Sequence, residues 1–122
     1  MNNDKIKLLP AAQAVTENFD WGSLTWFAAG ALGNGDAGTV GRCAIKPGKN
    51  NPPHYHPNCA ETLTVSAGHI KHTGNDGVDI EMRVGDTVTI PVGMPHRALN
   101  IGTEEAVLSI FFSSADRQTV RV

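Results

Sequence analysis

The chain has 122 residues, a length that suits one globular domain. Its net charge is −2 and its lysine and arginine residues are scattered, so nothing indicates a nucleic-acid surface. No apolar stretch reaches the roughly 18 residues of a membrane-spanning helix, so we expect no membrane partner.

The N-terminal segment MNNDKIKLLPAAQ lacks the apolar run of a secretory signal. Two cysteines, Cys43 and Cys59, are too few for a disulfide scaffold. These two observations predict a cytoplasmic location. We further expect residues 1–122 to form a single domain, with residues 1–23 as an N-terminal extension or arm.

Glycine and proline punctuate the chain, and the runs between them are short. Thirteen Gly and seven Pro leave segments of roughly five to nine residues, which favours an all-β sandwich or barrel. Residues 11–18 are the exception, where we expect a helical turn or a loop. The predicted strands, in chain order, are residues 24–32, 39–45, 62–66, 70–73, 78–84, 87–90, 96–101 and 106–112.

Two turns are predicted between these strands. Residues 74–77, Gly-Asn-Asp-Gly, suit a hairpin turn, because Gly and Asn accept the positive φ that such turns need. Residues 102–105 are expected to form a second turn. Gly85 and Gly93 are also expected to lie in turns.

Two motifs in the middle of the chain carry candidate metal ligands. The first occupies residues 48–68, GKNNPPHYHPNCAETLTVSAG, and the second occupies residues 85–100, GDTVTIPVGMPHRALN. The candidate ligands are His54, His56, Glu61 and His96. Imidazole nitrogens and a carboxylate oxygen suit a first-row divalent metal.

The alternation of side chains along a strand predicts that these ligands point inwards. Residues i and i+2 share a face, so Glu61 lies on the same face as Leu63 and Val65. That apolar face is the buried one, and a lone buried carboxylate is costly unless a cation neutralises it. His96 shares a face with Ala98 by the same rule, and His54 and His56 also share one.

The spacing of both motifs resembles the two signature motifs of the cupin superfamily at every fixed position. The resemblance covers residues 48–100 and implies a double-stranded β-helix, the jelly-roll or cupin barrel. The small size and single motif pair resemble quercetinase-like monocupins. That resemblance implies dioxygenase-type oxidation or cleavage of an oxygen-chelating small molecule.

We therefore expect a metal-dependent enzyme with one divalent transition metal per chain. Fe²⁺ or Mn²⁺ is favoured, and Ni²⁺, Zn²⁺ and Cu²⁺ suit the same ligands. Glu61 is expected to be a ligand that also accepts a proton during catalysis. Two alternatives remain open: a redox-neutral lyase, isomerase or cyclase, and a non-catalytic sugar or metabolite binder.

Residues outside the four ligands receive structural interpretations. His69 and His72 are expected to be ordinary surface or packing residues. Cys43 and Cys59 are expected to be small buried thiols, and Asn100 to support a strand-end turn. Each ligating imidazole should donate its second N–H to a carbonyl, a carboxylate or water.

Trp26, Phe111 and Phe112 are expected to fill the core or a subunit interface, unless one of them lines a pocket. Arg42 is expected to be exposed or at a dimer interface. Its alternative is an inward orientation, in which it would bind an anionic substrate group bidentately.

A homodimer is also expected. Residues 24–32 and 106–112 are apolar on both faces, so both faces of these strands favour burial. A small jelly roll also leaves strand edges that need a cover. A twofold partner meets both needs, with exchange of the N-terminal strand as one arrangement.

Overall fold

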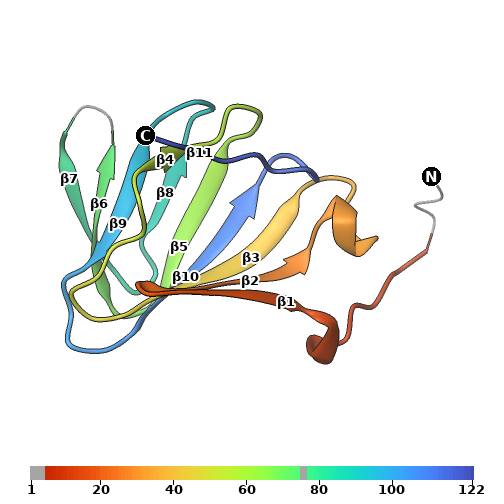
Figure 1. The fold of residues 1–122 in the computed structure, drawn as a ribbon, viewed down its shortest axis with the longest axis horizontal. Helices are drawn as coiled ribbons and strands as arrows, with labels where there is room; N and C mark the ends of the chain where they lie inside the picture. The colour runs from red at the N-terminus through yellow and green to blue at the C-terminus, as the bar shows by residue number, and fades with distance from the viewer. Residues whose placement is uncertain (1–4, 75–76) are drawn as a thin grey trace.

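Two antiparallel β-sheets build the fold in the computed structural model, which describes residues 5–74 and 77–122 (Figure 1). Among these residues, the larger sheet has six strands in the order β1-β2-β3-β10-β5-β8 and the smaller has five in the order β11-β4-β9-β6-β7. The predicted all-β jelly roll is therefore confirmed. The strands are β1 (Val15–Phe19), β2 (Gly22–Ala28), β3 (Thr39–Ile45), β4 (His54–Tyr55), β5 (Glu61–Ala67), β6 (His69–Gly74), β7 (Asp79–Arg83), β8 (Thr87–Ile90), β9 (His96–Asn100), β10 (Ala106–Phe112) and β11 (Val120–Arg121).

Three strand predictions match their observed bounds, and most others shift by one residue at each end. The clear error is the strand predicted at 24–32. The observed strand, β2, begins at Gly22 and ends at Ala28, and a 3₁₀ turn, Gly30–Leu32, follows it. Because an apolar run reads alike in a strand and in a tight turn, composition alone could not locate this end.

The N-terminal region is more ordered than a free arm. A 3₁₀ turn spans Ala11–Gln13, which agrees with the expected helical turn, but β1 occupies Val15–Phe19 and pairs with β2. The expectation of a turn or loop was wrong for that second part. All but one residue of β1 is exposed, so its sequence carries no buried face that could signal a strand.

Gly22 begins β2 where two backbones approach closely. A Cβ built on Gly22 would lie 1.8 Å from the carbonyl oxygen of Ala44. Gly22 pairs with Ile45 in the β2–β3 register, so the missing side chain permits this contact.

The predicted turn glycines behave as expected where the structure describes them. Gly85 and Gly93 have φ of 93° and 79°, a conformation that glycine adopts without steric cost. The amide of Gly77 donates to the carbonyl of Gly74 at 3.1 Å, and β6 and β7 pair on either side. Asn75 and Asp76, the central residues of that predicted turn, lie outside the described residues.

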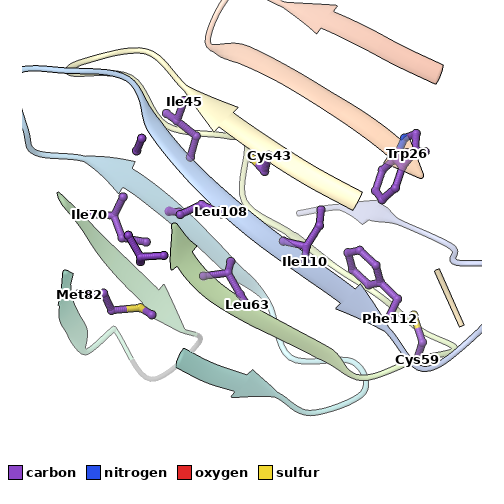
Figure 2. Packing of buried hydrophobic residues seen from close by; sticks show 13 residues of the cluster. Trp26, Cys43, Ile45, Cys59, Leu63, Ile70, Met82, Leu108, Ile110 and Phe112 are labelled. Atoms are coloured by element: carbon purple, nitrogen blue, oxygen red, sulfur yellow. The ribbon is translucent and has the colours of Figure 1, made fainter. Parts of the chain in front are cut away.

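The hydrophobic core lies between the two sheets (Figure 2). Ile45 and Ile70 are fully buried at one end of this cluster, and Trp26 and Phe112 lie at the other end. The described helical segments are both short 3₁₀ turns, and neither could cross a lipid bilayer.

The strand register places the motif residues next to one another. β4 pairs with β9 so that His54 lies opposite His96. β5 lies between β10 and β8, and Glu61 is opposite both Phe112 and Ile90. The two motifs therefore meet across the space between the sheets, although many residues separate them along the chain.

Asn100 ends β9 and joins three chain segments through its side chain. Its Nδ2 donates to the carbonyls of Ile45 and Glu104, both at 2.8 Å, and its Oδ1 accepts from the amide of Gly102 at 2.9 Å. It is 1% exposed. The expected role in a strand-end turn is confirmed.

Substituting Asn100 with alanine should destabilise the fold. The change leaves buried backbone groups without partners, and each costs about 1–3 kcal/mol, so we expect a loss of roughly 2–4 kcal/mol. Urea unfolding followed by circular dichroism measures this loss. Asn18→Ala, on the exposed strand β1, is the matched control and should change stability by less than about 0.5 kcal/mol. Equal effects of the two substitutions would contradict the prediction.

Candidate metal centre

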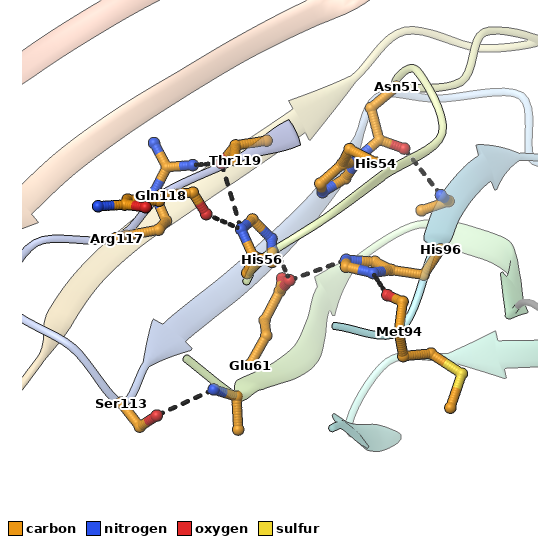
Figure 3. Close-up of polar contacts among 12 residues, drawn as sticks. Asn51, His54, His56, Glu61, Met94, His96, Ser113, Arg117, Gln118 and Thr119 are labelled. Atoms are coloured by element: carbon orange, nitrogen blue, oxygen red, sulfur yellow. Dashed lines mark hydrogen bonds and ion pairs between the residues drawn. The ribbon is translucent and has the colours of Figure 1, made fainter. Parts of the chain in front are cut away.

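Four side chains from the two motifs converge between the sheets (Figure 3). His54 begins β4, His56 follows that strand, Glu61 begins β5 and His96 begins β9. One potential ligand atom from each residue lies within 4.8 Å of all the others. The structure thus brings together all four predicted ligands, as a group that could hold a metal ion.

Glu61 lies in the middle of this group. Its Oε1 is 2.9 Å from Nε2 of His96 and 3.2 Å from Nε2 of His56. The rings of His54 and His96 have centroids 4.4 Å apart. Glu61 is only 5% exposed, so bulk water does little to stabilise its charge.

The Nδ1 atom of each imidazole contacts a backbone carbonyl oxygen. Nδ1 of His54 contacts the oxygen of Pro52 at 2.8 Å, and Nδ1 of His96 contacts the oxygen of Met94 at 2.9 Å. Nδ1 of His56 contacts the oxygen of Gln118 at 2.9 Å. The prediction that the outer nitrogens have hydrogen-bond partners is confirmed for all three residues.

These contacts fix the tautomers of the three rings. A carbonyl oxygen can only accept a hydrogen bond, so Nδ1 must carry the proton in each ring. In the neutral form, Nε2 then presents a lone pair. Lone pairs from His56 and His96 and a carboxylate oxygen face one another, an arrangement that a cation would stabilise.

The pKa shifts of His54 and Glu61 favour the protonation states that a metal requires. Burial, together with the neighbouring His96, lowers the pKa of His54 to about 4. Burial opposes ionisation of Glu61, but His56 and His96, which can donate to it only when Nε2 is also protonated, lower its pKa to about 2. At neutral pH the site therefore holds an ionised carboxylate and a neutral His54.

Glu61 also changes the pKa of His96. Burial lowers its pKa, yet the hydrogen bond and negative charge of Glu61 outweigh burial and raise the pKa overall. A proton on His96 and a metal ion are therefore alternative ways to balance the same carboxylate.

A cavity of about 320 Å³ opens beside the four residues. Much of its wall is apolar and includes Leu24, Trp26, Ile110 and Phe112. Charged side chains also line it: Glu17, Arg117 and Arg121. The volume and mixed lining suit one small organic molecule with a polar group.

His72 is a cavity residue that the sequence analysis did not identify. It is 4% exposed, and its ring stacks with that of His96 at a centroid distance of 5.4 Å. Burial lowers its pKa to about 4, and its Nε2 has no hydrogen-bond partner among the described residues. The missed signal was its shared face with Ile70, a buried residue of the same strand. His69 pairs instead with Glu81 and is partly exposed.

Arg117 and Arg121 line the cavity, whereas Arg42 does not. Arg42 is exposed, and its guanidinium lies 5.3 Å from the ring centroid of Phe27. The inward alternative for Arg42 is therefore wrong. Arg117 lies between β10 and β11, where no strand periodicity indicates direction, and sequence reasoning missed it.

The remaining candidates divide between the core, the cavity and the outer surface. Cys43 and Cys59 are buried free thiols, as expected, and burial raises the pKa of Cys43 to about 12. Trp26, Phe112 and Cys43 also line the cavity. Phe111 is 42% exposed and takes no part in the cavity.

Comparison with known proteins places this geometry in a family. The family model described as Cupin domain matches residues 41–112. The chain is 33% identical over 91 residues to the wheat (Triticum aestivum) protein named oxalate oxidase GF-3.8. That match covers 69% of this chain and 41% of the relative. Germin-like protein 3-5 of rice (Oryza sativa subsp. japonica) is 34% identical over 83 residues, which are 62% of this chain and 37% of the relative. The chain thus spans about two fifths of the length of these curated relatives.

Solved structures show the same fold. The oxalate decarboxylase of Lactobacillus farciminis, in its formate complex, superposes with a TM-score of 0.83 at 19% identity, over 91% of this chain and 34% of that one. A recombinant oxalate oxidase in complex with glycolate superposes with a TM-score of 0.74 at 26% identity, over 84% of this chain and 55% of that one.

Loading with Mn²⁺ should stabilise the protein at about one ion per chain. At roughly 100 times the dissociation constant, we expect the Tm to rise by about 10 °C, and chelation with EDTA should reverse the rise. Elemental analysis and differential scanning fluorimetry measure the two effects.

The His96→Ala variant should lower metal affinity by more than the roughly 10- to 100-fold caused by loss of a ligand's hydrogen-bond partner. His69→Ala removes a partly exposed imidazole outside the group and serves as the control. If His96→Ala bound Mn²⁺ like the His69→Ala protein, the four residues would not be the ligands.

Proposed function

This chain belongs to the cupin family, and from that premise we propose that it is a metal-dependent oxidoreductase acting on a small oxygen-bearing organic molecule. The observation that carries the proposal is the convergence of His54, His56, Glu61 and His96 at the edge of a small cavity. We propose one divalent ion per chain at this group, with Mn²⁺ or Fe²⁺ favoured.

Similarity supports the oxidative part of the proposal. Oxalate oxidases from wheat and barley are among the relatives above 30% identity. A bound metal would polarise an oxygen of the substrate and exchange electrons with it or with dioxygen. The proposal includes two types of reaction. In dioxygenase-type chemistry, oxygen atoms enter the product; in the other type, electrons pass to dioxygen without oxygen insertion.

The chain's own residues would divide the remaining work. The carbonyls of Pro52, Met94 and Gln118 would keep the three imidazoles oriented. Glu61 is the buried carboxylate of the cavity, so it is the residue best placed to accept a proton from a bound substrate. The apolar wall would exclude water from the reacting atoms.

The location and the extent of the domain are also proposals. Cys43 and Cys59 are free thiols, which supports the reducing cytoplasm. The strands from β1 to β11 belong to the same two sheets, which supports a single domain over residues 1–122.

A homodimer is proposed on the outer face of the larger sheet. Exposed apolar side chains gather there: Phe111 pairs with Val40 across β10 and β3, and Val40 pairs with Ala28 across β3 and β2. Val40 is 41% exposed and Phe111 42%. Because β1 pairs with β2 of its own chain, a symmetric contact through this face needs no strand exchange.

Activity should depend on dioxygen and on the four candidate ligands His54, His56, Glu61 and His96, called the metal group below. We expect Mn²⁺- or Fe²⁺-loaded protein to consume dioxygen with at least one member of a panel of hydroxy acids, keto acids, dicarboxylates and catechols. His96→Ala and Glu61→Gln should lower the rate at least about 1000-fold, since the metal contributes several kcal/mol to transition-state stabilisation. An oxygen electrode with product analysis makes the measurement, and His69→Ala should retain the activity.

Three results would contradict this proposal in distinct ways. Product formation without dioxygen uptake would assign a redox-neutral lyase, isomerase or cyclase. Saturable binding without any product would assign a non-catalytic binder. Turnover that survives in His96→Ala would remove the metal group from the reaction.

The dimer should separate when the outer face becomes charged. Phe111→Glu places carboxylates in the proposed contact, where the desolvation cost opposes association. Light scattering at micromolar concentration should give the mass of two chains for the wild type and of one chain for the variant. Val92→Glu, at an exposed site 57% accessible on a loop, is the control and should stay dimeric. A single-chain mass for the wild type would overturn the dimer.

A further inference from the structure

Arg117 is a cation held at the wall of the same cavity as the metal group. Its guanidinium carbon lies 4.2 Å from the ring centroid of Trp26 and 5.2 Å from that of Phe112. Both rings and Arg117 itself line the cavity. Contacts of this kind restrict the orientation of a long, flexible side chain.

The segment that carries Arg117 is hydrogen-bonded to residues of the first motif, including His56 (Figure 3). Nδ2 of Asn58 donates to the carbonyl of Asp116 at 2.7 Å, and Oδ1 of Asn58 accepts from the amide of Gln118 at 3.0 Å. The carbonyl of Gln118 also receives the hydrogen bond from His56. Residues 116–118 therefore have a fixed position relative to the metal group, and Arg117 shares it.

The guanidinium has more donors than its observed partners use. Nη1 of Arg117 donates to the hydroxyl of Thr119. Among the described residues, no carboxylate lies within ion-pair distance of Arg117. A guanidinium carries several N–H donors in a planar fork that matches a carboxylate.

The nearby acidic groups are not suited to satisfy this charge. The carboxylate of Glu61 already contacts the rings of His56 and His96. Glu17 is exposed on β1. Burial lowers the pKa of Arg117, while the negative charge of Glu17 raises it; an arginine still keeps its proton across the physiological range.

We propose that Arg117 binds a carboxylate of the substrate, so that the substrate is a small organic anion held between Arg117 and the His54, His56, Glu61 and His96 group. This inference rests on the proposed function, because the second contact of the substrate is the metal group. Charge-assisted, bidentate hydrogen bonds would fix one end of the molecule and select for acids over neutral analogues. The cavity volume of about 320 Å³ limits the substrate to a small molecule.

The experiment compares dicarboxylates with their uncharged diamides. Oxalate, malonate, succinate and glutarate are titrated by calorimetry into wild-type protein, before and after Mn²⁺ loading, together with the uncharged diamide of each acid. The variants are Arg117→Gln, Arg117→Lys and the control Arg83→Gln, which removes an arginine that is 71% exposed on β7. Metal content and Tm are measured on every sample, so loss of folding or of metal is seen directly.

At least one dicarboxylate should bind Arg117→Gln about tenfold more weakly than wild type, since the variant loses a charge-assisted hydrogen bond. Its diamide, which has no carboxylate, should bind both proteins alike, and Arg117→Lys should recover part of the loss. Arg83→Gln should match wild type throughout.

Two outcomes overturn the inference: wild type and Arg117→Gln bind every acid equally, or no acid binds wild type at millimolar concentration. If wild type takes up no Mn²⁺, the proposed function fails. The dependence of acid binding on Arg117 in that metal-free protein then still decides the present inference.

Discussion

Oε1 of Glu61 lies 2.9 Å from Nε2 of His96 and 3.2 Å from Nε2 of His56, and these two contacts set the electrostatics of the site. With Nδ1 protonated by its carbonyl partner, each neutral ring turns a lone pair toward a carboxylate that also has only lone pairs to offer. Such a group is unfavourable in a buried setting unless a proton or a metal ion lies between its members. The raised pKa of His96 corresponds to a proton held between His96 and Glu61. The chemistry of the four side chains favours a metal ion in its place.

The sheets provide the geometry that this electrostatic constraint requires. Pairing of β4 with β9 places His54 opposite His96, and Glu61 enters from β5 in the facing sheet. The segment after β10 then crosses to β4, where β11 pairs and the carbonyl of Gln118 orients His56. One C-terminal segment therefore both orients a candidate ligand and carries Arg117, one of the cations of the cavity wall.

The sequence predicted what depends on regular alternation. Glu61, Leu63 and Val65 alternate with half-buried threonines along β5, and the structure confirms this inward face. The same rule applied to β6 would have placed His72 inward beside Ile70, but an isolated histidine carries no second signal. Strands of two residues, β4 and β11, are too short to show any period, and they were not predicted.

Arg42 and Arg117 show where sequence reasoning ends. In β3, the buried side chains of Cys43 and Ile45 define the inner face, so Arg42 must point outwards. Arg117 follows no such rule, because its position depends on the rings of Trp26 and Phe112 and on the hydrogen bonds of Asn58 to the neighbouring backbone. Trp26 and Asn58 are distant from it in the chain.

The core and the cavity divide one inner surface between stability and binding. Fully buried aliphatic side chains such as Ile45 and Ile70 fill one end and leave no space. At the other end, Trp26 and Phe112 line the cavity, and charged side chains line it with them. Substitutions at the filled end should therefore alter folding, whereas changes around Arg117 and Thr119 can alter which molecule binds while the sheets stay intact. This separation explains how a short chain can keep a buried, charged group and still fold around it.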